Sequence, residues 1–124
     1  MDIYKTRDFS RWARKQGLMD TALCQAVQEM ANGLYEADLG GNLFKKRIAR
    51  RGQGKSGGFR VLVATNLGNL WFFLYGFSKN ERSNIDNTEE AALKKLAAVL
   101  LSMSSQDLGK AQNSGELFKV NCDA

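Results

Sequence analysis

Histidine and proline are absent from the 124 residues, and only two cysteines occur. The lack of histidine excludes the common zinc sites and histidine-based acid–base catalysis. The cysteines, Cys24 and Cys122, lie far apart in the chain and form no C-x-x-C motif, so we expect two reduced thiols in a cytoplasmic protein. We expect neither a metal nor another cofactor.

Long apolar runs are also missing. No stretch approaches the roughly 20 apolar residues that a membrane-spanning helix needs, and the charged N-terminal residues do not resemble a signal peptide. The hydrophobic share of 44% and the charged share of 25% are typical of a globular protein. We therefore expect a single cytoplasmic domain over residues 1–124 that makes no membrane contact.

Acidic residues are scarce in the middle of the chain. Between Gly40 and Arg82 there are nine lysines and arginines but one acid, Glu81, whereas the segments on either side are slightly acidic. Charge of one sign that is gathered in one segment is typical of a site for a polyanion such as nucleic acid. A basic hairpin that is merely solvated is the alternative.

Hydrophobic periodicity predicts the elements ahead of this basic segment. Residues 2–6 predict a short strand. Residues 7–17 predict a helix that ends at Gly17, and residues 20–34 predict a second helix capped by Asp20 or Thr21. We expect the two helices to form a hairpin against a sheet.

The basic segment and the C-terminal part predict a sheet and a third helix. Residues 42–82 read as a meander of three strands, with a turn at 66–69 and a last strand that is apolar on both faces, as in a covered central strand. Residues 88–104 predict a helix with Thr88 as its N-cap. Residues 105–124 form a tail with a short helix and an extended end. The fold class is α+β, with the helical hairpin and the C-terminal helix on one side of a mostly antiparallel sheet.

The glycine-rich stretch RRGQGKSGGFR contains G-K-S, the end of a phosphate-binding P-loop. A P-loop requires a glycine at position 49, where this chain has Ala49, and it must be followed by a helix. Here a strand follows, so the motif is not a P-loop. The stretch instead predicts a flexible basic loop between two strands, in which glycines let the backbone approach phosphates closely.

Strand alternation sorts the cations into two groups. Lys45, Arg47 and Arg51 should share one face, while Lys46 and Arg50 should lie on the more apolar face. We expect Lys46 to extend its charge to an edge of the sheet. Whether Arg60 lies beside Lys45 and Arg47 depends on the strand register, which the pattern leaves open.

Two motifs at a fixed separation resemble the RelE/ParE toxin superfamily of type II toxin–antitoxin systems, in its HigB-like branch. They are K-S-G-G-F-R at 55–60 and Y-G-F-S-K-N-E-R-S at 75–83, and the detailed similarity covers about residues 39–105. The resemblance implies a RelE-like fold and a ribosome-dependent endoribonuclease that cleaves translated mRNA. The implied chemistry is attack of a ribose 2′-OH on the adjacent phosphate without a metal.

The resemblance also implies the site. The catalytic candidates are Lys45, Arg47, Arg60, Lys79 and Arg82, with Arg60 expected to contact the scissile phosphate. The RNA-binding candidates are Arg50, Arg51, Lys55, Tyr75 and Glu81. Glu81 has a second reading, in which it only pairs with Arg82 or Lys79 or caps the next helix. The family's tyrosine at the end of this motif is replaced by Asp86.

The implied partners are a cognate antitoxin, expected to be a small helix-turn-helix protein, and the ribosomal A site with its mRNA. Operator DNA would be reached only through the antitoxin. Two alternatives stay open: a ParE-like inhibitor of DNA gyrase that performs no chemistry, and a non-catalytic nucleic-acid-binding module.

Overall fold

A computed structural model describes residues 1–50 and 54–122, with residues 54–56 described by their backbone alone. The elements in chain order are β1 (Asp2–Thr6), α1 (Arg7–Gln16), α2 (Asp20–Ala31), β2 (Ala37–Asp38), β3 (Leu43–Arg50), β4 (Gly54–Thr65), β5 (Leu70–Ser78), α3 (Asn87–Leu101), α4 (Ser105–Asn113) and β6 (Leu117–Lys119). The six strands form one sheet in the order β2-β3-β4-β5-β1-β6. The pairing of β1 with β5 is parallel, and the other pairings are antiparallel. The predicted α+β class is confirmed.

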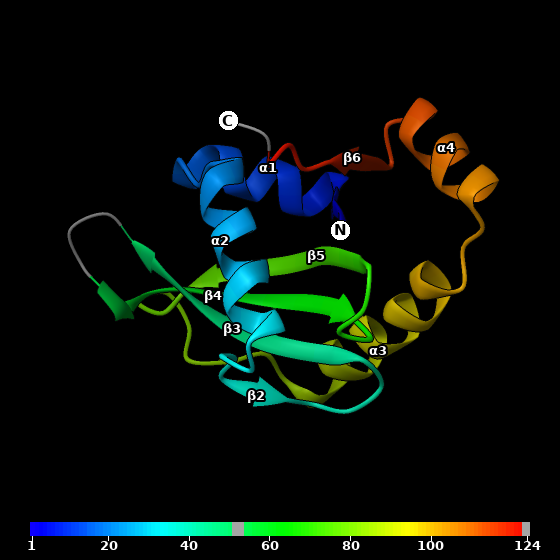
Figure 1. The fold of residues 1–124 in the computed structure, drawn as a ribbon. Helices are drawn as coiled ribbons and strands as arrows, with labels where there is room; N and C mark the ends of the chain where they lie inside the picture. The colour runs from blue at the N-terminus through cyan, green and yellow to red at the C-terminus, as the bar shows by residue number, and fades with distance from the viewer. Residues whose placement is uncertain (51–53, 123–124) are drawn as a thin grey trace.

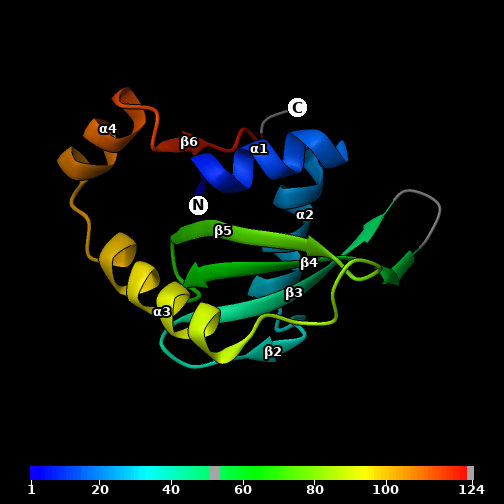
Figure 2. The same cartoon turned by 180° about the vertical axis from the view of Figure 1, so that it is seen from behind.

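Helices cover both faces of the sheet rather than one. Alternate residues of β4 point to opposite sides, so Val61 and Val63 pack with α1 and α2, whereas Leu62 and Ala64 pack with α3 and α4. Figure 1 shows α2 in front of the sheet, and Figure 2 shows α3 on the reverse side. The expectation of helices on one side was therefore wrong, because the central strands are apolar on both faces and each face needs a cover.

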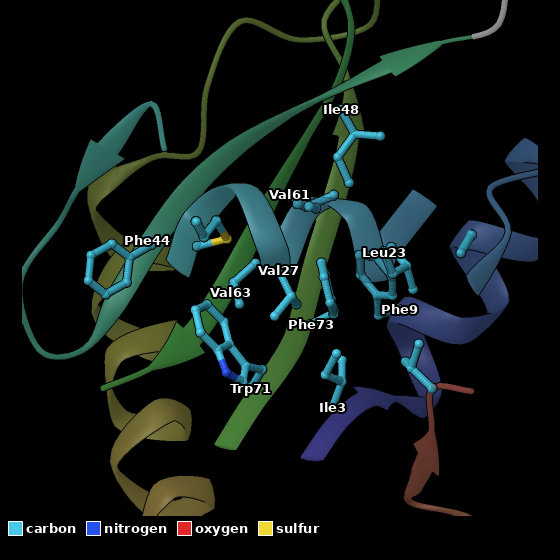
Figure 3. Packing of buried hydrophobic residues seen from close by; sticks show 14 of the residues in the cluster. Ile3, Phe9, Leu23, Val27, Phe44, Ile48, Val61, Val63, Trp71 and Phe73 are labelled. Atoms are coloured by element: carbon cyan, nitrogen blue, oxygen red, sulfur yellow. The ribbon is translucent and has the colours of Figure 1, made fainter. Parts of the chain in front are cut away.

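The core on the α1/α2 side is built around aromatic side chains from β5. Trp71 and Phe73 are fully buried there, and they pack with Val27 of α2 and Phe9 of α1 (Figure 3). The predicted covered, central position of β5 is confirmed, because β5 lies between β4 and β1.

Gly76 sets how closely α1 lies to β5. A Cβ atom at this position would come within 2.2 Å of Cζ3 of Trp12, so no larger residue fits without displacing the indole. The indole in turn packs edge-on against Phe59 of β4, with ring centroids 5.3 Å apart. Because Gly76 has no side chain, the indole of Trp12 can pack directly against β5.

The helix ends agree with the sequence only in part. Gly17 ends α1 in the left-handed conformation, at φ 70°, as predicted. The cap of α2 is Met19, which makes no side-chain cap bond, and the cap of α3 is Asp86, which forms a capping box with Glu89. The predicted caps Asp20, Thr21 and Thr88 were wrong because each lies inside its helix.

The glycine-rich stretch contributes more strand and less loop than predicted. The first residue of β4 is Gly54, which lies opposite Arg50 of β3 after an irregularity between Ile48 and Arg50. Part of the stretch therefore extends the β3–β4 hairpin. Of the sequence predictions in this region, Arg51 and the side chain of Lys55 lie outside the described residues.

The C-terminal segment returns across the N-terminal elements. The third helix was predicted to run to residue 104, but the chain breaks after Leu101 and forms α4, and the extended end becomes β6 beside β1. Val120 is buried and donates its backbone N–H to the carbonyl of Ile3. This return brings Cys122 to Cys24 of α2, and the two form a disulfide. The expectation of two reduced thiols was therefore wrong, because their separation in sequence concealed their contact.

Among the described residues, no helix is long and apolar enough to span a membrane.

Replacing both cysteines by serine should destabilise the protein. The disulfide closes a loop of 98 residues, and a cross-link of this kind restricts the unfolded chain, so we expect the free energy of unfolding to fall by about 2–5 kcal/mol. Urea denaturation under non-reducing conditions measures the loss, and wild-type protein with excess reductant should match the variant. Equal midpoints for wild type and variant, together with two titratable thiols in the native wild type, would refute the cross-link.

Candidate functional site

The register of β3, β4 and β5 places three of the five predicted catalytic residues in two neighbouring rows. Arg47 lies opposite Arg60, which lies opposite Phe77. In the next row, Lys45 lies opposite Leu62, which lies opposite Tyr75. The question that the sequence left open is thereby answered, because Arg60 does lie beside Arg47 on the face that carries Lys45.

A carboxylate that sequence reasoning missed joins the two arginines. Oε1 of Glu36, just ahead of β2, lies 2.9 Å from Nε of Arg60 and 3.4 Å from Nε of Arg47. The Arg60 side chain is only 6% exposed, whereas that of Arg47 is 49% exposed. Arg47 is therefore the more accessible of the two. Nothing in the sequence around Glu36 signals this role, because its partners lie 11 and 24 positions further along the chain.

The segment after β5 folds back over the same face. Lys79 donates its backbone N–H to the carbonyl of Gly58, 3.1 Å away, and Nζ of Lys45 donates to Oδ1 of Asn84 at 3.4 Å. Nζ of Lys79 is exposed and donates to the carbonyl of Ser83. Lys45 and Lys79 therefore meet at one site, although 34 positions separate them in sequence.

Arg82 is held by α3 and is not a free cation. Its two terminal nitrogens reach the carboxylate of Glu89 at 3.0 and 2.6 Å, and one of them also donates to the hydroxyl of Tyr75 at 3.2 Å. Nε donates to the carbonyl of Asn84, and the guanidinium lies 5.6 Å from the ring centre of Phe77. This bidentate geometry orients the arginine and fixes Tyr75 beside it.

The same contacts shift the pKa values of Glu89 and Arg82. Hydrogen bonds from Arg82, and then from the backbone N–H of Asp86, lower the pKa of Glu89 from 4.5 to about 2. The hydrogen bond with Glu89 raises the pKa of Arg82 further above its ordinary range. The pair is therefore ionised throughout the physiological pH range.

Two of the predicted cations stand apart from this site. The guanidinium of Arg50 lies 5.6 Å from the ring centre of Phe59, on the α1/α2 side of the sheet. Lys46 is only 4% exposed and pairs with Glu29 at 2.7 Å, while it also donates to the carbonyl of Leu34. The expectation that Lys46 extends to the sheet edge was wrong, because α2 supplies a carboxylate directly above it.

Glu81 is exposed and forms no ion pair with any described residue. Its expected pairing with Arg82 or Lys79 is not seen, because Glu89 takes the arginine. The helix is capped by Asp86, so Glu81 is not its cap either.

The sequence of the chain matches one family of known proteins. A profile described as the RelE toxin of the RelE / RelB toxin-antitoxin system matches residues 1–120. The chain belongs to the RelE toxin family. No curated protein and no solved structure matched it.

Membership assigns a general role to this RelE-family toxin. It is the toxin component of a toxin–antitoxin system, and a cognate antitoxin is its partner. The convergence of Lys45, Arg47, Arg60 and Lys79 supplies positive charge for a polyanion, and Glu36 supplies a carboxylate within that charge. Such an arrangement can grip a phosphodiester and move a proton beside it.

Replacing Glu89 by glutamine should flatten the acid limb of the stability profile. Because the pKa of Glu89 is lowered to about 2 in the folded protein, its stabilising contribution is fully present above the ordinary pKa of about 4.5 and is lost as the pH falls toward 2. Urea midpoints between pH 6 and pH 2 measure this. The substitution should have a smaller effect in an Arg82→Gln background, where the hydrogen bond from the backbone N–H of Asp86 still lowers this pKa. Parallel acid limbs for wild type and Glu89→Gln would show that Arg82 does not hold this carboxylate.

Proposed function

We propose that this RelE-family toxin is a ribosome-dependent endoribonuclease of the HigB-like branch that cleaves translated mRNA. The observation that carries the proposal is the strand register, which aligns Arg47 with Arg60 and leaves Lys45 on the same face. The segment that holds Lys79 then closes over that face through Asn84. Cations from two strands and a returning segment form one site for a phosphodiester.

The chemistry is intramolecular. The ribose 2′-OH attacks the adjacent phosphorus, the bond from phosphorus to the 5′ oxygen breaks, and a cyclic 2′,3′-phosphate and a free 5′-OH result. Lys45 and Arg47 stabilise the charge that builds up on the phosphate oxygens. Arg60, being buried, acts mainly by positioning Glu36 and Arg47.

Two protons must move in a chain without histidine. Glu36 is the candidate to accept the 2′-OH proton because its carboxylate lies beside Arg47, where the phosphate would bind. Lys45 and Tyr75 are the candidates to protonate the leaving 5′ oxygen. Tyr75 accepts a hydrogen bond from Arg82, so its own hydroxyl proton remains available for donation.

The ribosome and the antitoxin complete the proposal. Motifs K-S-G-G-F-R and Y-G-F-S-K-N-E-R-S support the HigB-like branch, for which the ribosomal A site presents the mRNA. A small helix-turn-helix antitoxin neutralises the toxin and carries any contact with operator DNA.

Substitution of the site cations should abolish cleavage in cells. After induction of the wild type, sequencing of mRNA 5′ ends on ribosomes should show cuts in phase with codons. Arg47→Ala and Lys45→Ala should each reduce them by about a hundredfold or more, because each removes charge stabilisation from the transition state. Arg14→Ala, which removes an exposed arginine of α1, is the matched control and should cleave normally.

Arg60→Ala needs a stability measurement beside it, because its side chain is buried. Intact messages with stalled gyrase would overturn the proposal in favour of a ParE-like inhibitor. Salt-sensitive RNA binding without any cuts would favour a non-catalytic module.

Glu36→Gln separates proton transfer from binding. The amide keeps the size and shape of the side chain, so the fold and RNA binding should persist. Cleavage should fall by about a hundredfold or more, as expected for loss of a general base. Single-turnover cleavage on programmed ribosomes, beside a filter-binding assay, measures both. A variant that cleaves at the wild-type rate would exclude Glu36 as the base.

A further inference from the structure

A cavity lies next to the cation site, at the end of β5. Its volume is about 210 Å³. It is lined by the aromatic residues Phe9 and Trp12 from α1 and Tyr75 and Phe77 from β5. Asp8, Glu81 and Arg82 stand around these rings. Aromatic walls beside charged groups suit a flat, polar ring system.

The cavity follows from the strand order. The register of β1 on β5 ends with Lys5 opposite Phe73, after which the chain turns into α1. The last residues of β5 therefore lie beside helix α1 rather than beside a strand. Trp12 closes one wall against Gly76, where no side chain intervenes. Its ring is further held by Phe9 and Phe59, with centroids 5.5 and 5.3 Å away.

The three charged side chains around the cavity differ in their ion-pair partners. Arg82 is fixed by Glu89 and lies over Phe77, so it forms a rigid wall. Asp8 pairs with Arg11 at 3.1 Å on the exposed surface of α1. Glu81 is exposed and has no ion-pair partner among the described residues, which leaves its carboxylate as an available acceptor.

A chain of contacts links the cavity to the phosphate site. Arg82 donates to the carbonyl of Asn84, and Asn84 accepts from Lys45. A nucleotide whose phosphate meets Lys45 would therefore have a neighbouring base within reach of the cavity.

We propose that this cavity binds one nucleobase of the RNA and favours bases that carry an exocyclic amine. The proposal rests on the proposed endoribonuclease function. The base stacks on Trp12, as bases do on aromatic side chains in single-stranded RNA recognition. Glu81 accepts a hydrogen bond from the amine of adenine, cytosine or guanine. Uracil has no exocyclic amine, and its ring donor, N3–H, is flanked by two carbonyl oxygens that the carboxylate repels.

Tryptophan fluorescence offers a direct test. Trp71 is fully buried and Trp12 is half-buried in the cavity wall, so quenching by a stacked base reports Trp12. The full chain is titrated with 2′-O-methylated trinucleotides of A, C, G or U, which cannot be cleaved, and with the four nucleoside monophosphates. We expect quenching by the trinucleotides, with A, C or G bound at least about fivefold more tightly than U.

Two variants and one control sharpen the test. Trp12→Phe should lose the quenching and weaken trinucleotide binding about tenfold, measured by fluorescence anisotropy of labelled RNA. Glu81→Gln, a surface substitution, should leave quenching intact but bring U close to the other bases. Arg14→Ala should change neither.

The outcomes separate this inference from the proposed function. Equal affinity for all four bases, or unchanged binding by Trp12→Phe, would overturn it even if the wild type cleaves mRNA. Monophosphates that bind as tightly as trinucleotides would also overturn it, since the site would then belong to a free nucleotide. Selective trinucleotide binding by a chain that never cuts mRNA would support the base site and overturn the nuclease.

Discussion

The antiparallel pairing of β3 with β4 is the constraint on which the site depends. Its register sets Arg47 against Arg60 on one face and Ile48 against Phe59 on the other. A shift of a single residue would turn the arginines into the α1/α2 core and the apolar side chains out of it. Burial of Val61 and Val63 under α2 therefore enforces the placement of charge on the opposite face.

Neighbouring carboxylates hold the arginines in place. Glu36 lies between Arg60 and Arg47, and the carboxylate of Glu89 accepts two hydrogen bonds from the guanidinium of Arg82. Each pair costs desolvation and side-chain freedom, but it leaves the guanidinium already oriented before a substrate arrives. The half-buried Lys45 and the exposed Lys79 remain as the adaptable charges of the site.

Local signals predicted those features that depend on near neighbours. The C-terminal glycine of α1 was readable because a left-handed residue ends a helix wherever it occurs. The cap of α3 was misread because Asp86, Asn87 and Thr88 all have side chains suited to an N-cap, and only the entry direction of the chain selects Asp86. The P-loop reading could be rejected from Ala49 and the following strand, whereas the start of β4 at Gly54 depends on its partner in β3.

Composition and alternation by themselves established a basic segment on an α+β sheet and the side of β3 on which Lys45 and Arg47 lie. They did not establish which charges are neutralised. Glu36, Glu29 and Glu89 each meet a cation on another element, and the disulfide joins α2 to the chain end. Such contacts require the helices, the register and the returning segments to be in place together. They follow from the packing of residues that lie far apart in the chain. A local sequence pattern carries no information about such packing.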